Sequence, residues 1–306
     1  KVGRIAEHQD YVEVEANDET WRANTVFDAR HQGSANLKNV ADTKDIYLHQ
    51  TFLGWKIEFT SPVFDEQTAT LMDFRTAQTG GVNFIYVLPC SDREALVEST
   101  SFSVSPTNRN NHLNAVTKYI SENFGEDYDI KAEESGALPM TTAKMPFKSG
   151  ERIFNIGIAG GAARPSSGYA FQRIQRQTSA IARAIVDEKE IPKTFAPRKY
   201  DFFDAVFLEA LAQNPALAKN CFLRMFEKIS PDSLIRFLTD ESSAADDLAV
   251  INALPKMYFG AAVWRNRRRN FVANHEKDGK IEPAHGTLHH SLDEFARRLF
   301  ARRVER

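Results

Sequence analysis

The chain has 306 residues, of which 42% are hydrophobic and 26% are charged, and its formal net charge is −2 at pH 7. This length suits two closely joined domains better than one small core. The near-neutral charge argues against a nucleic-acid-binding protein, because contacts to phosphates require a surplus of basic residues.

The N-terminal segment predicts short strands. Residues 10–16 alternate between polar and apolar side chains, and a return strand is expected at 21–25. Residues 25–30 contain a β-branched and aromatic run, which predicts a buried strand that leads into a loop at Asp28. The chain begins with Lys1 directly in strand-like sequence, so we expect further residues upstream of it.

Residues 46–103 have a strongly β pattern, with tight turns at Gly80-Gly81 and at 89–93. Consecutive strands joined by tight turns predict an antiparallel sheet. A helix is expected over 108–124, where apolar residues recur at helical spacing. The expected strands cover residues 47–59, 68–75, 82–88 and 94–102.

A short strand at 152–157 runs into a glycine-rich loop, and a helix is expected after it with an apolar face at Phe171, Ile174, Ile181 and Ile185. Strand, glycine loop and helix in succession form an anion-binding geometry, because glycines allow close approach of backbone amides and the helix N-terminus adds positive potential. A tight connection without any ligand is the alternative interpretation.

The C-terminal part predicts helices. Asn214-Pro215 and Ser230-Pro231 are each typical of an N-cap followed by proline at the first helical position. The basic run that begins at Arg265 is either a solvated helix end or a contact with anionic lipid headgroups. Residues 271–306 are predicted to be a tail with one helix near 291–303. The tail histidines lack partners at metal-binding spacing, so no metal site is predicted; they are His285, His289 and His290.

The aromatic content gives a further indication. The 22 phenylalanines concentrate in the middle strands and in the helices between 200 and 237, where a large apolar ligand, a membrane surface or an ordinary core could use them. No apolar run reaches the ~18 residues of a spanning helix, and no signal peptide is visible. The two cysteines, Cys90 and Cys221, form no paired motif, which indicates a reducing compartment.

Several segments together resemble the lycopene cyclase family of flavoproteins, over roughly residues 10–262. The loop at 160–169 resembles the family's C-terminal flavin-contacting loop, although the Asp that precedes the glycines in neighbouring families is absent here. The Gly-x-Gly-x-x-Gly fingerprint of a dinucleotide fold is also absent. The other matching segments are Asp28-Ala29, residues 49–58, the Met-Asp-Phe-Arg sequence at 72–75, residues 84–89 with 96–100, and a Gly-Ala-Leu-Pro-Met turn at 136–140.

The resemblance implies an α/β, FAD-dependent two-domain fold, with a Rossmann-like nucleotide-binding domain, an antiparallel substrate-domain sheet and a C-terminal helical part. The domains that follow from it are a partial FAD-binding domain at 1–45 and 147–195, a substrate domain at 46–146, a helical part at 196–265 and a tail at 266–306. Because the first part of the flavin fold is not found, we expect this 306-residue chain alone to bind flavin poorly and to be inactive.

The resemblance also implies reduced FAD as cofactor, with NAD(P)H as the reductant. Arg164 either faces the flavin edge or caps the loop. Pro165 and Gly168 are expected to set the entry into the following helix. The expected cofactor-binding residues are Asp28, Ala29, Gly160, Gly161, Arg164, Pro165, Ser167 and Gly168.

Glu98 is the expected catalytic acid. By strand alternation it shares a face with Leu96, Thr100 and Phe102, and apolar surroundings raise a carboxyl pKa by disfavouring the anion. The resemblance agrees, because Glu98 matches the family's catalytic glutamate. An exposed glutamate on a polar face is the alternative.

Asp73 and Arg75 are the other expected catalytic residues. They share strand parity and are expected to orient Glu98 or to shape the mouth of the cavity, unless they form a surface ion pair. Glu133 and Glu134 precede the expected turn at Gly136 and are predicted to be solvated, although this position lies near the flavin in the family fold.

The implied function is carotenoid biosynthesis by a lycopene β-cyclase, an intramolecular lyase or isomerase. Its substrate is lycopene or a related acyclic carotenoid, and it would be cytoplasmic and peripherally attached to a membrane through the apolar helices between 200 and 264. Two alternatives remain open: a flavin-dependent monooxygenase or isoprenoid reductase of the same fold, and a non-catalytic carotenoid- or lipid-binding fragment.

Overall fold

The computed structural model describes residues 1–30, 45–193 and 197–277, without the side chains of 268–277. The chain forms two compact units, Lys1–Asn266 and Arg267–Arg306, and the following description concerns the first. The predicted tail helix at 291–303 and the tail histidines lie outside the described residues. Among the residues that can be described, no helix is long and apolar enough to cross a membrane.

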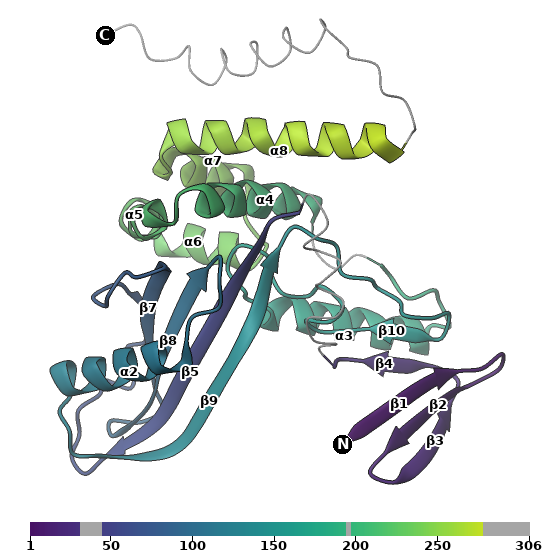
Figure 1. Ribbon diagram of the computed structural model, residues 1–306, viewed down its shortest axis with the longest axis horizontal. Helices are drawn as coiled ribbons and strands as arrows, with labels where there is room; N and C mark the ends of the chain where they lie inside the picture. The colour runs from purple at the N-terminus through teal and green to yellow at the C-terminus, as the bar shows by residue number, and fades with distance from the viewer. Residues whose placement is uncertain (31–44, 194–196, 278–306) are drawn as a thin grey trace, which may run out of the picture. The chain divides into compact units, whose positions relative to one another are not determined.

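A five-stranded antiparallel sheet is the centre of this unit, in the strand order β6-β7-β8-β5-β9 (Figure 1). The α/β class with an antiparallel sheet is therefore confirmed. The sheet strands are β5 (Tyr47–Phe59), β6 (Thr70–Asp73), β7 (Gly81–Pro89), β8 (Glu94–Ser103) and β9 (Tyr128–Thr141).

Two smaller sheets come from the N-terminal segment. One is antiparallel and consists of β1 (Val2–Glu7), β2 (Val12–Ala16) and β3 (Glu19–Ala23). In the other, β4 (Val26–Asp28) pairs in parallel with β10 (Ile153–Asn155), so the strand expected at 25–30 lies beside the strand that enters the glycine loop.

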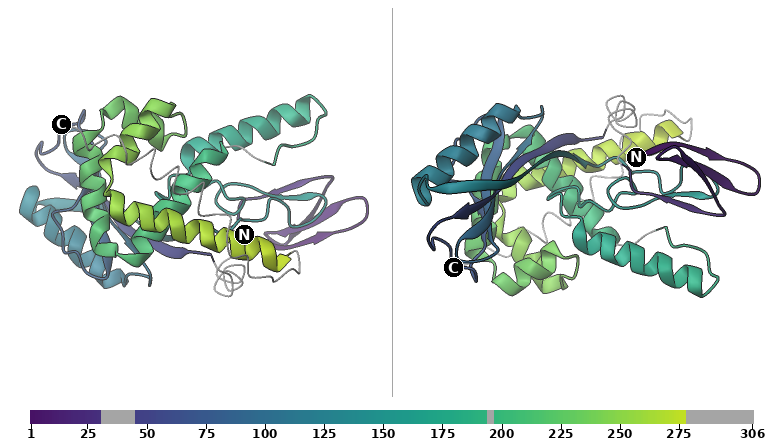
Figure 2. Two further views of the ribbon diagram at one scale, coloured as in Figure 1. Left: turned by 90° about the horizontal axis from the view of Figure 1, so that it is seen from above. Right: turned by 90° about the horizontal axis from the view of Figure 1, so that it is seen from below.

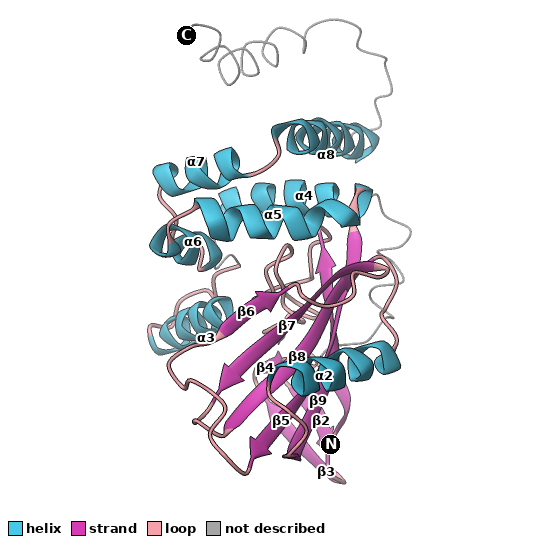
Figure 3. Cartoon of the chain, turned by 90° about the vertical axis from the view of Figure 1, so that its left-hand side faces the viewer, coloured by secondary structure: helices cyan, strands magenta, loops and turns pink. Residues whose placement is uncertain are grey.

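Both faces of the central strands β7, β8 and β5 are largely covered, whereas most of the edge strand β9 is exposed. On one face, Ile85 and Val97 pack against Val116 and Ile120 of helix α2 (Arg109–Asn123). Figure 3 shows α2 lying against the strands, and the helices α4 to α7 grouped together at one end of the sheet. Because both faces are covered by apolar elements, nearly every residue of β8 from Ala95 onward is removed from water.

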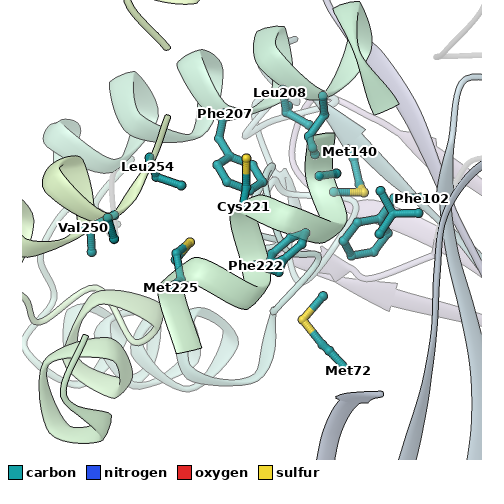
Figure 4. Packing of buried hydrophobic residues seen from close by; sticks show 14 of the residues in the cluster. Met72, Phe102, Met140, Phe207, Leu208, Cys221, Phe222, Met225, Val250 and Leu254 are labelled. Carbon is teal, nitrogen blue, oxygen red and sulfur yellow. The ribbon is translucent and has the colours of Figure 1, made fainter. Parts of the chain in front are cut away.

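The other face of the sheet packs against the C-terminal helices. Phe102 and Met140 of the sheet meet Phe207 and Phe222 of the helices in one hydrophobic cluster (Figure 4). Many of the phenylalanines between residues 200 and 237 therefore belong to an ordinary hydrophobic core. The helices are α4 (Arg198–Gln213), α5 (Pro215–Lys228), α6 (Pro231–Leu238), α7 (Ala244–Ala253) and α8 (Lys256–Lys277).

The structure corrects the expected turn at 136–140. These residues, together with Glu133 and Glu134, belong to β9, which pairs with β5 along its length. A Cβ atom on Gly136 would lie 2.7 Å from the ring of Phe52, so glycine lets this ring cross the strand. The expected strand at 68–75 is also shorter than predicted, because Met72 has a φ of 55° and pairing ends at Asp73.

The predicted apolar face of α3 (Phe171–Val186) is confirmed at Ile181 and wrong at Phe171 and Ile185. Its buried residues are Arg173, Gln177, Ile181 and Ala184, whereas Phe171 is 71% exposed. Both views in Figure 2 show α3 extending away from the five-stranded sheet. The buried polar residues of this helix hold ion pairs and hydrogen bonds, which hydrophobic periodicity does not detect.

Two details of the C-terminal helices differ from expectation. Ser230 caps α6 through its side chain, but Asn214 makes no side-chain capping hydrogen bond to α5 although it occupies the N-cap position. The first arginine of the basic run, Arg265, donates to the buried Glu209 at 2.9 Å and forms an ion pair with it. This arginine is therefore held by the helical core rather than presented as a free cation.

Candidate functional site

Glu98 lies in the middle of β8, half-buried, with Tyr86 of β7 and Gly54 of β5 as its cross-strand neighbours. The hydroxyl of Thr100, two residues along the same face, donates to its carboxylate at 2.7 Å. Phe84, Tyr86 and Phe102 surround this region of the face. The apolar and aromatic setting expected for the acid is present.

Burial raises the pKa of Glu98 to about 7. The Thr100 hydroxyl acts in the opposite direction, and the nearby carboxyl of Glu134 raises the pKa further. A carboxyl that titrates near neutrality holds a proton in a large fraction of molecules and can still release it, which is the requirement for a general acid.

The glycine loop connects β10 to α3. Gly157, Gly161 and Gly168 have φ values of 62°, 79° and 72°, which favour glycine, and a Cβ on Gly160 would lie 2.2 Å from the carbonyl oxygen of Asn155. The amides of Gly160 and Gly161 donate to carbonyls of the loop itself. Contact between these two amides and a cofactor therefore stays a prediction from the resemblance.

The end of the loop, at Gly168, approaches the sheet very closely. A Cβ on Gly168 would lie 1.8 Å from Oε1 of Gln50 on β5, so a larger residue would displace this amide, and the φ of 72° also favours glycine. Gln50 is 9% exposed, and its Oε1 has no hydrogen-bond partner among the described residues. An unsatisfied buried amide costs free energy, which marks this contact as a place for a polar ligand group.

An apolar pocket lies between the sheet, the loop and the C-terminal helices. From the loop, Tyr169 lines this pocket together with Tyr86, the cross-strand neighbour of Glu98. Burial raises the pKa of Tyr86 well above its ordinary value. The pocket is lined by Met72, Tyr86, Phe102, Ser167, Tyr169, Phe222, Met225, Phe226, Leu234 and Leu238.

Glu98, Gln50, Ser167 and Gly168 are therefore brought to one side of the sheet. Gln50 and Gly54 lie four residues apart on the same face of β5, which corresponds to a separation of ~13 Å along the strand. The site consists of a polar end at the glycine loop and an acidic end at Glu98, with aromatic side chains nearby.

Arg164 does not act as the expected flavin contact. It is 1% exposed, donates from Nε to Asp204 at 2.9 Å, and donates to the carbonyl of Phe237. Its guanidinium also lies over the rings of Tyr200 and Phe237. The side chain is fully occupied in anchoring the loop to α4 and α6, which corrects the cofactor interpretation; Pro165 is the next residue of the same anchored turn.

Asp204, Asp240 and Arg173 complete a buried ion network with Arg164. Arg173 of α3 donates to Asp240 at 2.6 Å, and Asp240 also lies 3.7 Å from Arg164. Burial raises the pKa of Asp204, against the opposing effect of the two arginines. Sequence reasoning missed this network, because its members are spread over 77 positions that no local pattern connects.

Asp73 and Arg75 lie on the opposite face of the sheet from Glu98. Asp73 pairs with Ile85, which pairs with Ser99, and it accepts from the Tyr119 hydroxyl of α2 at 2.7 Å. Arg75 forms an ion pair with Asp73 at 2.6 Å, and its side chain is 74% exposed. The expectation that this pair orients Glu98 is wrong, because the sheet separates them.

A polar cavity of about 440 Å³ lies beside this ion pair, on the α2 side. Within its lining, His112 is buried and its two ring nitrogens lie 3.0 Å from the hydroxyls of Ser99 and Thr51. Burial lowers the pKa of His112, so this histidine is neutral at neutral pH. Its contacts with Thr51 and Ser99 connect α2 to β5 and β8, on the face of the sheet opposite to Glu98.

Asp28 and Ala29 lie at the end of β4. The backbone N–H and the Nε of Arg30 each donate to the Asp28 carboxylate at 2.9 Å. The backbone N–H of Ile156 donates to the Asp28 carbonyl at 3.0 Å. This places Asp28 beside the start of the glycine loop. A cofactor role for the two residues stays a prediction.

Comparison with known proteins gives a family match. The family model described as lycopene cyclase protein matches residues 1–263. A lycopene beta-cyclase from Pseudescherichia vulneris is 25% identical over 277 residues, which cover 86% of this chain and 68% of the relative.

The chain is also similar to solved structures at low sequence identity. A geranylgeranyl bacteriochlorophyll reductase-like protein from Thermoplasma acidophilum gives a TM-score of 0.46 at 15% identity, covering 87% of this chain and 68% of that chain. The tetracycline destructase Tet(51) gives a TM-score of 0.42 at 16% identity, covering 83% and 68%.

Replacement of Arg164 by Met tests its anchoring role. In the flavin-free chain we expect the free energy of unfolding to fall by about 3–5 kcal/mol, because buried aspartates lose their partner. Arg176→Met is the control, since Arg176 is a partly exposed member of the same network and should cost about 1 kcal/mol or less. Urea unfolding followed by circular dichroism measures both; equal stability of Arg164→Met and wild type would instead favour a cofactor role.

The raised pKa of Glu98 predicts a pH-dependent stability difference. The folded-state pKa of about 7 exceeds the ordinary 4.5, so the favourable contribution of the protonated carboxyl is present below 4.5 and lost as pH rises through 7. Relative to Glu98→Gln, the wild type should therefore lose up to roughly 3 kcal/mol between about pH 5 and pH 8. Urea unfolding at both pH values checks this, and a constant difference would contradict the assignment.

Proposed function

The chain belongs to the lycopene cyclase family, and on that premise we propose that it converts the ψ-end groups of lycopene to β-rings by redox-neutral, acid-initiated cyclisation. Family membership supports carotenoid cyclisation in general. The observation that carries the specific proposal is Glu98, a half-buried carboxyl with a pKa near 7 beside an aromatic pocket.

The chemistry assigned to Glu98 is a proton transfer to carbon. Its carboxyl donates a proton to the terminal double bond, and the neighbouring double bond attacks the tertiary cation to close a six-membered ring. Loss of one ring proton then gives the β-end group, so the product is an isomer of the substrate. The aromatic faces of Phe84, Tyr86 and Phe102 are electron-rich and suit a passing carbocation.

The residues at the loop end fit a flavin. Gly168 has no side chain where it meets the sheet, and the unsatisfied Oε1 of Gln50 suits an N–H donor such as those of the isoalloxazine ring. Gln50, Ser167 and Gly168 would hold this ring in our proposal. When bound in its reduced form, generated by NAD(P)H, FAD would supply an electron-rich system that stabilises cationic charge.

We further propose peripheral membrane attachment on the cytoplasmic side, because lycopene is insoluble in water. Exposed apolar residues on the C-terminal helices support this idea. They are Phe226, Ile235, Leu248, Ile251 and Met257.

Expression of the protein at its natural length in a lycopene-accumulating bacterium tests the cyclase proposal. We expect the pigment to change from red to yellow-orange, with a product of the same mass as lycopene. Glu98→Gln should lower cyclisation by about 100-fold or more, because it removes the proton donor.

Glu94→Gln is the matched control, since Glu94 begins the same strand and is ion-paired with Lys56. It should retain the wild-type pigment. Unchanged lycopene with well-expressed wild type would refute the proposal, and a reduced or oxygenated product would favour the isoprenoid reductase or monooxygenase alternative.

Flotation with phospholipid vesicles tests membrane attachment. We expect a fraction of the protein to float with the vesicles, and Met257→Glu, at a side chain that is 86% exposed, to reduce this fraction several-fold. Trp21→Glu, at an exposed residue of β3, is the control and should float like wild type. Recovery of all protein in the soluble fraction would refute attachment.

A further inference from the structure

The strand register places a second carboxyl on the same face of the sheet as Glu98, two strands away. Glu98 of β8 faces Gly54 of β5, and Gly54 in turn faces Glu134 of β9. These three strands lie side by side, with β9 at the edge of the sheet (Figure 1). Glu98 and Glu134 are therefore next-but-one neighbours across a residue that has no side chain.

Gly54 provides the space between the two glutamates. A Cβ at this position would lie 3.1 Å from the Cβ of Glu98 and 3.3 Å from its Cγ. Without that atom, the Glu98 side chain lies close against β5, and the nearby carboxyl of Glu134 adds to the rise in the pKa of Glu98 that burial causes. Glycine weakens a strand interior, so its place in the middle of a long central strand indicates a requirement for close approach.

The two carboxyls differ in their access to water. Glu134 is exposed on the edge strand, whereas Glu98 is half-buried beneath aromatic residues. A second carboxyl this near disfavours the ionised form of Glu98, because like charges repel. Glu134 thus connects Glu98 to solvent.

The other groups that face Glu98 do not provide this connection. The Thr100 hydroxyl of β8 donates to Glu98, and Tyr86 of β7 lines the apolar pocket with Tyr169 of the glycine loop. Lys56, further along β5, forms an ion pair with Glu94. Glu133, the neighbour of Glu134, accepts from Trp55 at 3.0 Å and pairs with Arg109 of α2, on the other face of the sheet.

We propose that Glu134 is the proton-exchange partner of Glu98, and that Gly54 keeps the space between their carboxyls open. The inference rests on the proposed cyclase function, in which Glu98 gives one proton to the substrate in each cycle. Glu134 returns a proton to the Glu98 carboxylate and takes one from water. The ring proton that the substrate loses passes to water, so no net proton is consumed.

The direct test is a titration of Glu98 in the full chain, labelled with ¹³C at the glutamate carboxyl and observed by NMR. The signal that disappears in Glu98→Gln identifies the residue, and its midpoint in wild type should lie near the pKa of about 7. In Glu134→Gln the midpoint should move to lower pH, because the like charge is removed. A fall of one unit from about 7 lowers the protonated fraction at pH 7 about fivefold.

Glu133→Gln is the matched control and should leave the midpoint unchanged. Gly54→Ala is a second variant, which should lower the midpoint by placing a methyl group between the carboxyls. An unchanged midpoint in Glu134→Gln, or an equal change in Glu133→Gln, would overturn the proposal.

The pH–rate profile of cyclisation separates this inference from the proposed function. Glu134→Gln should move the fall in rate at high pH toward acid by the same amount as the midpoint, whereas a purely structural role would lower the rate at every pH. A shifted midpoint with an unshifted profile would overturn the exchange role. If neither the wild type nor any variant cyclises lycopene, the proposed function is wrong. The titration would still show whether the carboxyls of Glu98 and Glu134 interact.

Discussion

The burial of both faces of the central sheet strands is the constraint on which the rest of the structure depends. Alternate residues of β8 enter two separate hydrophobic cores, one with α2 and one with the C-terminal helices. A residue on one face cannot act on a group that belongs to the other. Glu98 therefore shares its environment with Tyr86 and the glycine loop, whereas Asp73 belongs with Tyr119 of α2.

A buried ion network connects the glycine loop to the C-terminal helices. Arg164 in the loop is paired with Asp204 of α4 and, more distantly, with Asp240, which Arg173 of α3 also contacts. Burying four charges is favourable only when they satisfy one another, so the network specifies one position of the loop against the helices. That position sets Gly168 against Gln50 and Tyr169 against Tyr86, and so joins the polar end of the site to its acidic end.

Many elements could be predicted from the sequence, since alternation and turn residues are local signals. The strands β5, β7 and β8, the helix α2 and the loop-bearing strand β10 lie close to their expected positions, and the face of Glu98 followed from parity alone. The errors arise where local pattern and tertiary role diverge. Residues 136–140 have turn-like composition but pair as a strand, and α3 buries Arg173 and Gln177 together with Ile181, while Phe171 and Ile185 are exposed.

The sequence by itself determined the α/β class, the family resemblance and a glutamate on a largely apolar strand face. Only the tertiary structure decided which groups surround that glutamate. Strand parity assigns a side chain to a face, but neither the neighbouring strand nor its register follows from parity. For this reason the approach of Glu134 across Gly54, the contact of Gln50 with Gly168 and the burial of Arg164 appear only when distant segments are placed side by side.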